Sequence, residues 1–343
     1  MKAGLQDSSG LLLVDKPTGV TSHTVVAHVR KTLLRAFPHW DPRQQPGRKK
    51  IKGGPRPPRF KCGHAGTLDP LATGLLLVLV GKASRLSPFL MGMDKSYLAT
   101  VTFGEATDSL DSDGEVVNTA PVPAQPETIL QQLPQFQGDI LQVPPMISAL
   151  KYEGQPLYKL VRQGKPLPEL KARPVTISRL EALETRWSHA QMDFLVHCTS
   201  GTYIRSLARD IAQAAGTEGH ISALRRSSIG PFSVNEALEG VMQCGGVGMF
   251  EAMIPLSEAL PHVPQLELSS DEAVAVRQGI QPHPDWLNRC QERPSQSGKG
   301  EAIFGMMGPD KDLVAIGKLE TETGNPVIAA VIPAETEDSA ACD

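Results

Sequence analysis

The longest apolar run of the chain, Leu75 to Val80, follows a segment of small residues and loop formers. Six consecutive aliphatic side chains bounded by glycines predict a buried strand. The preceding segment, 63–74, contains one carboxylate, Asp69, and Pro70 after it disfavours helix at that position. We therefore expect Asp69 on a stiff loop that leads into a core strand. Such an aspartate is either a catalytic acid held in place or a turn residue bonded to its own backbone.

The remaining apolar and polar positions predict strands mixed with helices. Helices are expected at 22–36, 82–91, 157–164, 203–215, 220–226 and 269–279, the last with Ser270 as its N-cap. Strands are expected at 11–14, 95–104, 175–183, 191–198, 301–307, 313–319 and 327–332.

Residues 37–61 differ from their surroundings, because they are rich in proline and glycine and have no apolar period. Between Pro42 and Lys61 the chain carries eight basic residues and no acidic one. This composition predicts a flexible basic loop. The loop is either a contact for a polyanion or a solvated insertion, and its position beside the Asp69 segment favours the polyanion contact.

Composition limits the class of protein. At 343 residues one or two domains are expected. The longest apolar run is too short to cross a membrane and the first residues lack the pattern of a signal peptide, so we expect a cytoplasmic protein. Five scattered cysteines without a CxxC pair argue against a disulfide framework and a zinc site. The acidic run 105–115 lacks the spacing of a calcium loop and is expected to be a polar loop.

The net charge differs in sign between the first 260 residues and the rest of the chain. The net charge of −3 combines +5 over residues 1–260 with −8 over residues 261–343. The composition also changes after Pro264, where short strands and turn residues replace the longer elements. These changes predict a second, small β-rich domain with an acidic, disordered end.

Six motifs occur in one order along the chain, at residues 13–22, 63–76, 95–97, 143–164, 200–210 and 220–226. Through them the chain resembles the TruB family of pseudouridine synthases. Residues 263–335 resemble the PUA RNA-binding domain more weakly. The basic segment 37–61 departs from the compact bacterial pattern, in which this link is short.

The resemblance implies an α+β fold. Residues 1–262 would form a catalytic domain with a mixed, mostly antiparallel sheet flanked by helices. Residues 263–335 would form a small PUA-like domain, and residues 336–343 a disordered acidic tail.

The resemblance also implies an activity, the isomerisation of uridine to pseudouridine at position 55 in the T-arm of tRNA. The N1–C1′ bond breaks, the base turns, and the sugar is rejoined through C5. This reaction involves neither redox change nor phosphoryl transfer, so no cofactor or metal is expected. The sequence accordingly contains neither a GxGxxG motif nor a P-loop.

The resemblance assigns the chemistry to three residues. Asp69 would stabilise the positive charge at C1′ or attack the sugar. Arg205 would keep Asp69 ionised through a bidentate ion pair. Tyr97 would stack on the target base near the C5 proton. Without the resemblance, Arg205 is typical of a surface helix charge and Tyr97 of a core strand.

Four further residues would bind the substrate. His64 would fill the gap that the flipped uridine leaves in the RNA, since flipping costs a few kcal/mol. Tyr203 would be a second aromatic of the pocket, and Leu224 an apolar wall. Lys151 would contact phosphates, together with the basic loop. A lone loop histidine such as His64 is otherwise typically solvated.

Two other functions stay open. One is an RNA-binding or tRNA-folding protein that performs no chemistry, and the other is a guide-dependent synthase like the dyskerin relatives. The complete set of Asp69, Tyr97 and Arg205 favours an enzyme. A short acidic C-terminus without a lysine-rich tail favours a monomer that needs no protein partner.

Overall fold

The computed structural model of the protein describes residues 8–41, 43, 60–148, 150–164, 169–290, 292, 294 and 302–334. The acidic tail 336–343 and most of the basic loop 37–61 lie outside the described residues. Both ends of the predicted loop are packed, however, which corrects its boundaries. Trp40 stacks on Phe37 at 4.4 Å between ring centroids and on Phe60 at 5.9 Å, so aromatic burial fixes the two ends against each other.

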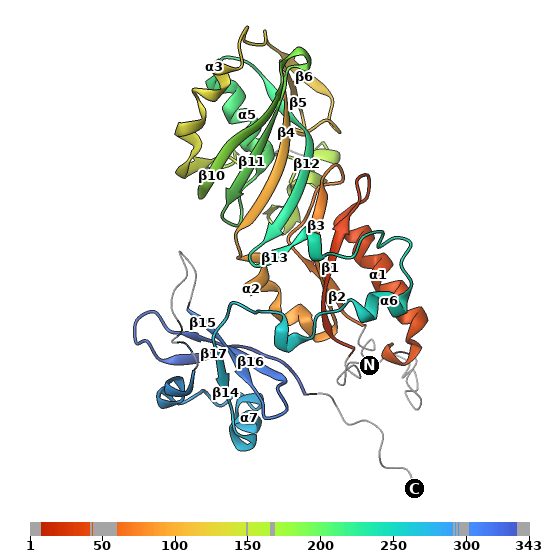
Figure 1. Cartoon of the computed structure of the whole chain (residues 1–343), viewed down its shortest axis with the longest axis vertical. Helices are drawn as coiled ribbons and strands as arrows, with labels where there is room; N and C mark the ends of the chain where they lie inside the picture. Colours follow the sequence, from red (N-terminus) through yellow and green to blue (C-terminus); the bar gives the residue numbers. More distant parts are fainter. Residues whose placement is uncertain are drawn as a thin grey trace.

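A large twisted sheet organises the molecule (Figure 1). Its order is β1-β3-β12-β4-β11-β10-β7, with β2 beside β3 and β13 beside β12. The strands are β1 (Gly10–Lys16), β2 (Cys62–Ala65), β3 (Thr73–Val80), β4 (Lys95–Phe103), β7 (Gly138–Gln142), β10 (Arg173–Arg186), β11 (Gln191–Cys198), β12 (Gly219–Ile229) and β13 (Phe232–Ser233). Its pairs are antiparallel except β12 with β3, which is parallel where Arg226 lies opposite Gly74. The mixed, mostly antiparallel sheet is therefore confirmed.

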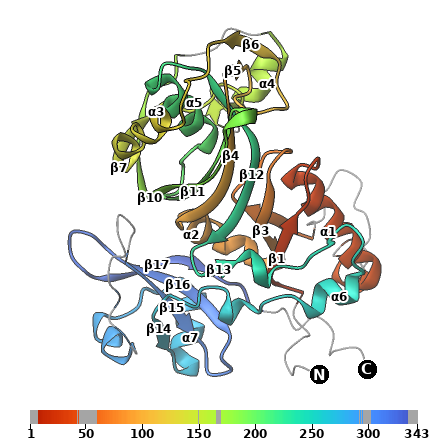
Figure 2. The same ribbon diagram turned by 45° about the horizontal axis from the view of Figure 1, so that its top comes forward.

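Helices flank this sheet. They are α1 (Ser22–Ala36), α2 (Ser87–Met91), α3 (Glu127–Leu130), α4 (Leu157–Arg162), α5 (Ile204–Ala214) and α6 (Gly246–Glu251). Helices α1 and α6 lie side by side near the β1 end, whereas α5 and α3 lie near β11 and β10 (Figure 2). The helix expected at 82–91 is a 3-10 helix, Gly81–Leu86, followed by the short α2. No described helix is both long and apolar enough to cross a membrane.

Two hairpins stand apart from the large sheet. They are β5 (Glu105–Thr107) with β6 (Val116–Thr119), and β8 (Lys151–Tyr152) with β9 (Gln155–Pro156). The second hairpin leads directly into α4.

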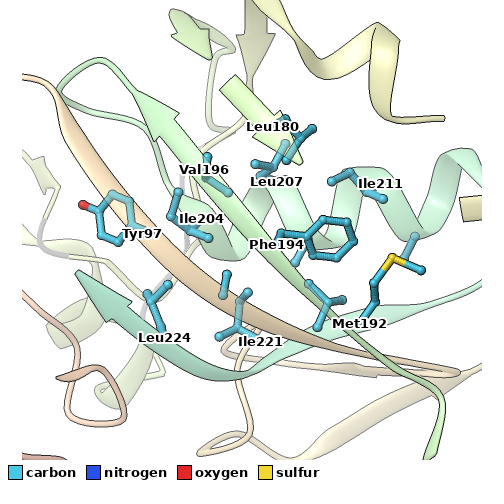
Figure 3. Close-up of a cluster of buried hydrophobic side chains, with 14 of the residues drawn as sticks. Tyr97, Leu180, Met192, Phe194, Val196, Ile204, Leu207, Ile211, Ile221 and Leu224 are labelled. Carbon is cyan, nitrogen blue, oxygen red and sulfur yellow. The ribbon is translucent and has the colours of Figure 1, made fainter. Parts of the chain in front are cut away.

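Strand β3 is buried on both faces, and this explains its unbroken apolar run. Its side chains divide between two clusters, Leu75, Leu77 and Leu79 in one and Leu76, Val78 and Val80 in the other. A third cluster fills the space between α5 and strands β4, β11 and β12 (Figure 3). The loop before β3 therefore enters the sheet where three cores meet.

A separate small sheet forms the C-terminal part. Its order is β14 (Gln265–Glu267), β15 (Ile303–Met307), β16 (Leu313–Leu319) and β17 (Pro326–Val331), and α7 (Ser270–Arg277) packs on it. Met307, Leu313 and Ile316 share a buried cluster with Leu11 and Leu79 of the large domain. The small sheet is thus joined to the large domain by apolar packing.

The helix predicted at 220–226 is wrong, because these residues lie in β12. Ile221 and Leu224 are three residues apart yet belong to the same buried cluster, a spacing typical of a helix. A register shift between Ile221 and Ala223 explains this, since an extra residue in a strand resets its alternation.

The N-cap of α7 is also one residue earlier than predicted. Ser269 accepts a hydrogen bond from the backbone of Glu272.

Gly74 tests how closely β3 packs against β12. Its φ is +99°, and a Cβ there would lie 2.3 Å from the carbonyl oxygen of Arg226. Gly138 has a similar φ of +91°, but a Cβ added there would meet nothing within 4 Å, which makes it a matched control. We expect Gly138→Ala to cost about 1 kcal/mol of unfolding free energy and Gly74→Ala at least about 3 kcal/mol. Urea denaturation measures both, and equal losses would contradict the clash.

Candidate active site

The loop that carries Asp69 joins β2 to β3 and is fixed by hydrogen bonds to the start of α1. The hydroxyl of Ser22 accepts from the backbone N–H of Leu68 at 2.8 Å and donates to the Leu68 carbonyl at 3.0 Å. The backbone N–H of Gly19 donates to the Pro70 carbonyl at 2.9 Å. The residues on either side of Asp69 are therefore held, and the expected stiff loop is present.

Lys16 also binds the loop that carries Asp69. Its side chain is fully buried, and its ammonium donates to the carbonyls of Pro17 and Val20 at 2.8 Å and of Pro70 at 3.3 Å. Burial lowers the pKa of Lys16 to about 8, although the negative charge of Asp69 acts in the opposite direction.

Arg226 on β12 is a second buried cation at this loop. Its guanidinium donates to the carbonyls of Gly66 at 3.0 Å and Leu75 at 2.8 Å, with a longer contact of 3.5 Å to Thr67. These carbonyls lie at the start of the loop that carries Asp69 and in β3, which follows it.

Arg205, in the first turn of α5, forms an ion pair with Asp69. The Nε of Arg205 lies 3.0 Å from Oδ2 of Asp69. Its terminal nitrogens donate to the carbonyls of Ser109 at 2.6 Å and Ile147 at 3.0 Å. The structure thus brings the predicted pair together, but through one nitrogen and not through the two-nitrogen fork expected from the sequence.

Asp111 is a functional candidate that the sequence did not reveal. It belongs to the acidic run expected to be a polar loop, yet its side chain is 7% exposed and lies 3.4 Å from a terminal nitrogen of Arg205. It also accepts a hydrogen bond of 2.6 Å from the Ser109 hydroxyl. Arg205 is therefore shared between two carboxylates.

Tyr97 and Leu224 form an apolar wall beside this pair. Tyr97 lies on β4, between Val196 of β11 and Arg226 of β12 in the sheet register. Tyr97 and Leu224 belong to one buried cluster, and Tyr97 stands at its end with its hydroxyl directed away from the other labelled side chains (Figure 3). Burial raises the pKa of Tyr97, while the positive charge of Arg226 opposes that rise.

Tyr203 directly precedes α5 and is positioned by Gln142. The Gln142 amide donates to the Tyr203 carbonyl at 3.1 Å and accepts from the Tyr203 N–H at 2.8 Å. Burial raises the pKa of the Tyr203 hydroxyl, and the charges of Arg205 and Asp69 act on it as well. Tyr203 therefore lies at the same site.

His64 and Lys151 lie at the edge of this group. His64 is half-buried on β2, and its Nδ1 has no hydrogen-bond partner among the described residues. Burial lowers its pKa, and the charge of Arg226 adds to that effect. Lys151 is exposed on β8 and is not part of the buried cluster. The described residues contain no cluster of His, Cys, Asp and Glu that could hold a metal ion.

Comparison with known proteins identifies the family. A family model described as "TruB family pseudouridylate synthase (N terminal domain)" matches residues 52–204. The tRNA pseudouridine synthase B of Stutzerimonas stutzeri is 40% identical over 274 residues, which cover 78% of this chain and 81% of that protein. The chain belongs to the TruB family.

Two further comparisons extend the match. The tRNA pseudouridine synthase B of Aeromonas salmonicida is 32% identical over 329 residues, covering 92% of each chain. A solved structure titled "Crystal Structure of a Cbf5-Nop10-Gar1 Complex" matches with a TM-score of 0.64 and 25% identity, over 94% of this chain and 84% of that chain. The fold of this TruB-family chain is therefore shared over nearly its whole length.

The pKa of Asp69 reflects both carboxylates at this TruB-family site. Burial raises the pKa of Asp69, and the negative charge of Asp111 raises it further, while Arg205 and Lys16 lower it. The first two influences prevail, so the carboxyl of Asp69 binds a proton more readily than an exposed aspartate does.

Replacing Asp111 tests whether its negative charge raises the pKa of Asp69. Asp111→Asn removes a like charge, so the pKa of Asp69 is expected to fall. Asp113→Asn is the matched control, because Asp113 is exposed and does not contribute to the Asp69 shift. The measurement is a ¹³C NMR titration of aspartate carboxyl groups, with the Asp69 signal assigned from Asp69→Asn. An unchanged or raised Asp69 pKa in Asp111→Asn would overturn this account.

Proposed function

We propose that the protein isomerises uridine to pseudouridine in tRNA, at position 55 of the T-arm. The observation that carries the proposal is the Asp69–Arg205 ion pair, set beside the aromatic ring of Tyr97. The TruB-family relatives named tRNA pseudouridine synthase B support the substrate class. No cofactor enters the proposed reaction.

Asp69 is the proposed catalytic carboxylate. Cleavage of the N1–C1′ bond develops positive charge at C1′, and the Asp69 carboxylate either stabilises that charge or bonds to the sugar. The detached base carries the bonding electron pair on N1 and turns. C5 then bonds to C1′, which breaks the Asp69–sugar bond where one has formed, and the proton lost from C5 is balanced by a proton gained at N1. More than a third of the Asp69 side-chain surface is exposed, so it is accessible to a substrate.

The other residues are proposed to bind and orient the flipped uridine. Tyr97 would stack on the base, with Tyr203 and Leu224 as further walls of its pocket. His64 would occupy the gap left in the RNA, where its half-buried ring offers an apolar surface. Lys151, exposed on β8, would contact a phosphate.

The alternatives have less support. A purely RNA-binding protein has no need for a buried arginine shared between Asp69 and Asp111, an arrangement with a high desolvation cost. The chain in the Cbf5 complex is less similar in sequence than the two tRNA pseudouridine synthase B proteins, at 25% against 40% and 32% identity. A guide-dependent enzyme is therefore not favoured.

The domain roles are also part of this proposal. Residues 1–262 would be the catalytic domain, and residues 263–335, including the β14–β17 sheet and α7, a PUA-like RNA-binding domain. The chain is proposed to act on tRNA in the cytoplasm as a monomer without an obligate protein partner.

Asp69→Asn tests the catalytic assignment. The variant should form no detectable pseudouridine on an unmodified tRNA transcript, because an amide cannot stabilise positive charge at C1′. Its tRNA affinity should stay within about tenfold of the wild type, about 1.4 kcal/mol. Chemical mapping of pseudouridine and filter binding measure the two quantities. Asp94→Asn, at an exposed aspartate, is the control and should keep full activity. Turnover by pure Asp69→Asn protein would exclude the assignment.

Arg205→Lys tests the role of the arginine. Lysine keeps the charge but cannot contact Asp69, Ser109 and Ile147 together, as the guanidinium does. We expect kcat to fall at least about 100-fold, or about 2.7 kcal/mol, with a smaller change in KM. Arg209→Lys, one turn further along α5, is the matched control and should keep near-normal kcat. Similar kcat values for the two variants would show that Arg205 has no special role.

A further inference from the structure

Arg226 is one of the largest fully buried side chains of the protein, at 1% exposure. Within the described parts of the chain, no carboxylate lies within ion-pair distance of it. A buried charge without a counter-charge is costly unless hydrogen bonds satisfy its donors. A buried Arg226 in the centre of the sheet therefore depends on hydrogen-bond acceptors for its guanidinium.

The carbonyls that accept from the Arg226 guanidinium lie at the start of the Asp69 loop and in β3, the strand that follows the loop. Nε donates to the Leu75 carbonyl, in the first residues of β3, and a terminal nitrogen donates to the Gly66 carbonyl, directly after β2. Because the guanidinium is planar and rigid, these bonds fix the two ends of the loop relative to each other. The span between them contains Asp69.

The backbone of Arg226 is tied to the same elements. It lies opposite Gly74 of β3 on one side and Tyr97 of β4 on the other. The close approach at Gly74, where a Cβ would lie 2.3 Å from the Arg226 carbonyl oxygen, leaves little freedom between the strands. One residue thus connects the strand of Tyr97 with both ends of the Asp69 loop.

The neighbouring arginine shows a different pattern. Arg225 is 40% exposed at its side chain and forms an ordinary ion pair of 2.6 Å with Asp15. It donates to no carbonyl of the Asp69 loop among the described contacts. Arg225 therefore supplies a matched control, with the same residue type in the same strand.

We infer that Arg226 is a positioning residue, whose guanidinium sets the conformation of the 66–72 loop so that Asp69 meets Arg205. This inference rests on the proposed function only for its kinetic consequence. The conformational part concerns the free protein.

The kinetic test compares Arg226→Gln, Arg226→Lys and Arg225→Gln on a tRNA transcript under single-turnover conditions. Arg226→Gln should lower the rate of pseudouridine formation at least 100-fold, with tRNA affinity within threefold. Arg226→Lys should recover at least tenfold of that loss, because its ammonium can still donate to a loop carbonyl. Arg225→Gln should remain within threefold of wild type. A rate for Arg226→Gln within fivefold of wild type, or a loss confined to tRNA affinity, would overturn the inference.

Hydrogen exchange gives a readout that needs no activity. In free Arg226→Gln, amides of the 66–72 loop should exchange at least tenfold faster than in wild type, while those of the β14–β17 sheet stay unchanged. Arg225→Gln should leave the loop protected. Unchanged loop exchange, or an equal increase throughout the chain, would overturn the inference. If Arg226→Gln fails to fold, Arg226→Met, which also removes the guanidinium donors, takes its place with the same expected direction and the same contradicting outcomes.

Measurements on the wild-type protein distinguish a failure of the proposed function from a failure of the inference about Arg226. If the wild-type protein forms no pseudouridine on tRNA, the proposed function fails, while loop exchange still decides whether Arg226 sets the loop conformation. If wild type is active and only the exchange result is negative, the inference about Arg226 fails and the proposed function stands.

Discussion

The buried guanidinium of Arg205 is the constraint on which the site depends. It contacts Asp69 and Asp111 and donates to the carbonyls of Ser109 and Ile147. These partners come from three segments far apart in the chain, and α5 supplies the arginine. Of the two carboxylates, Asp111 is buried together with Arg205, and removing one partner of such a buried pair typically costs about 3–5 kcal/mol, because a desolvated charge is left behind. The segments must therefore be in place together.

The Asp69 loop is positioned mainly through its backbone. Lys16 and Arg226 donate to carbonyls on either side of Asp69, and Ser22 exchanges two hydrogen bonds with Leu68. Because these contacts use carbonyls and N–H groups, the loop itself needs no further polar side chains. That explains why a single carboxylate stands among small and apolar residues. The Asp69 side chain is therefore available for the ion pair with Arg205.

The parts of this arrangement that are local could be predicted from the sequence. The unbroken apolar run of β3 and the Pro70 after Asp69 indicated a core strand and a stiff loop, and both are present. The strand at 219–229 was mistaken for a helix because a bulge gives it a helical spacing of apolar residues. Asp111 and Arg226 were missed because their partners are distant in the chain or are backbone carbonyls. Neither kind of partner leaves a pattern in the sequence. The motifs of the TruB family, and not periodicity, indicated Arg205 and Tyr97.

The single contact between Arg205 and Asp69 bears on the proposed reaction. A two-nitrogen fork would stabilise the Asp69 carboxylate strongly in the resting enzyme. Burial and the negative charge of Asp111 keep the pKa of Asp69 above its ordinary value, although the charge of Arg205, at 3.0 Å from Oδ2, lowers it. A carboxylate that is weakly stabilised at rest gains more when positive charge develops at C1′. Catalysis depends on this difference between the ground state and the transition state, and not on the strength of the resting ion pair. Sharing one arginine between two carboxylates is thus a physical route to the reactivity proposed for Asp69, while the loop stays held in place.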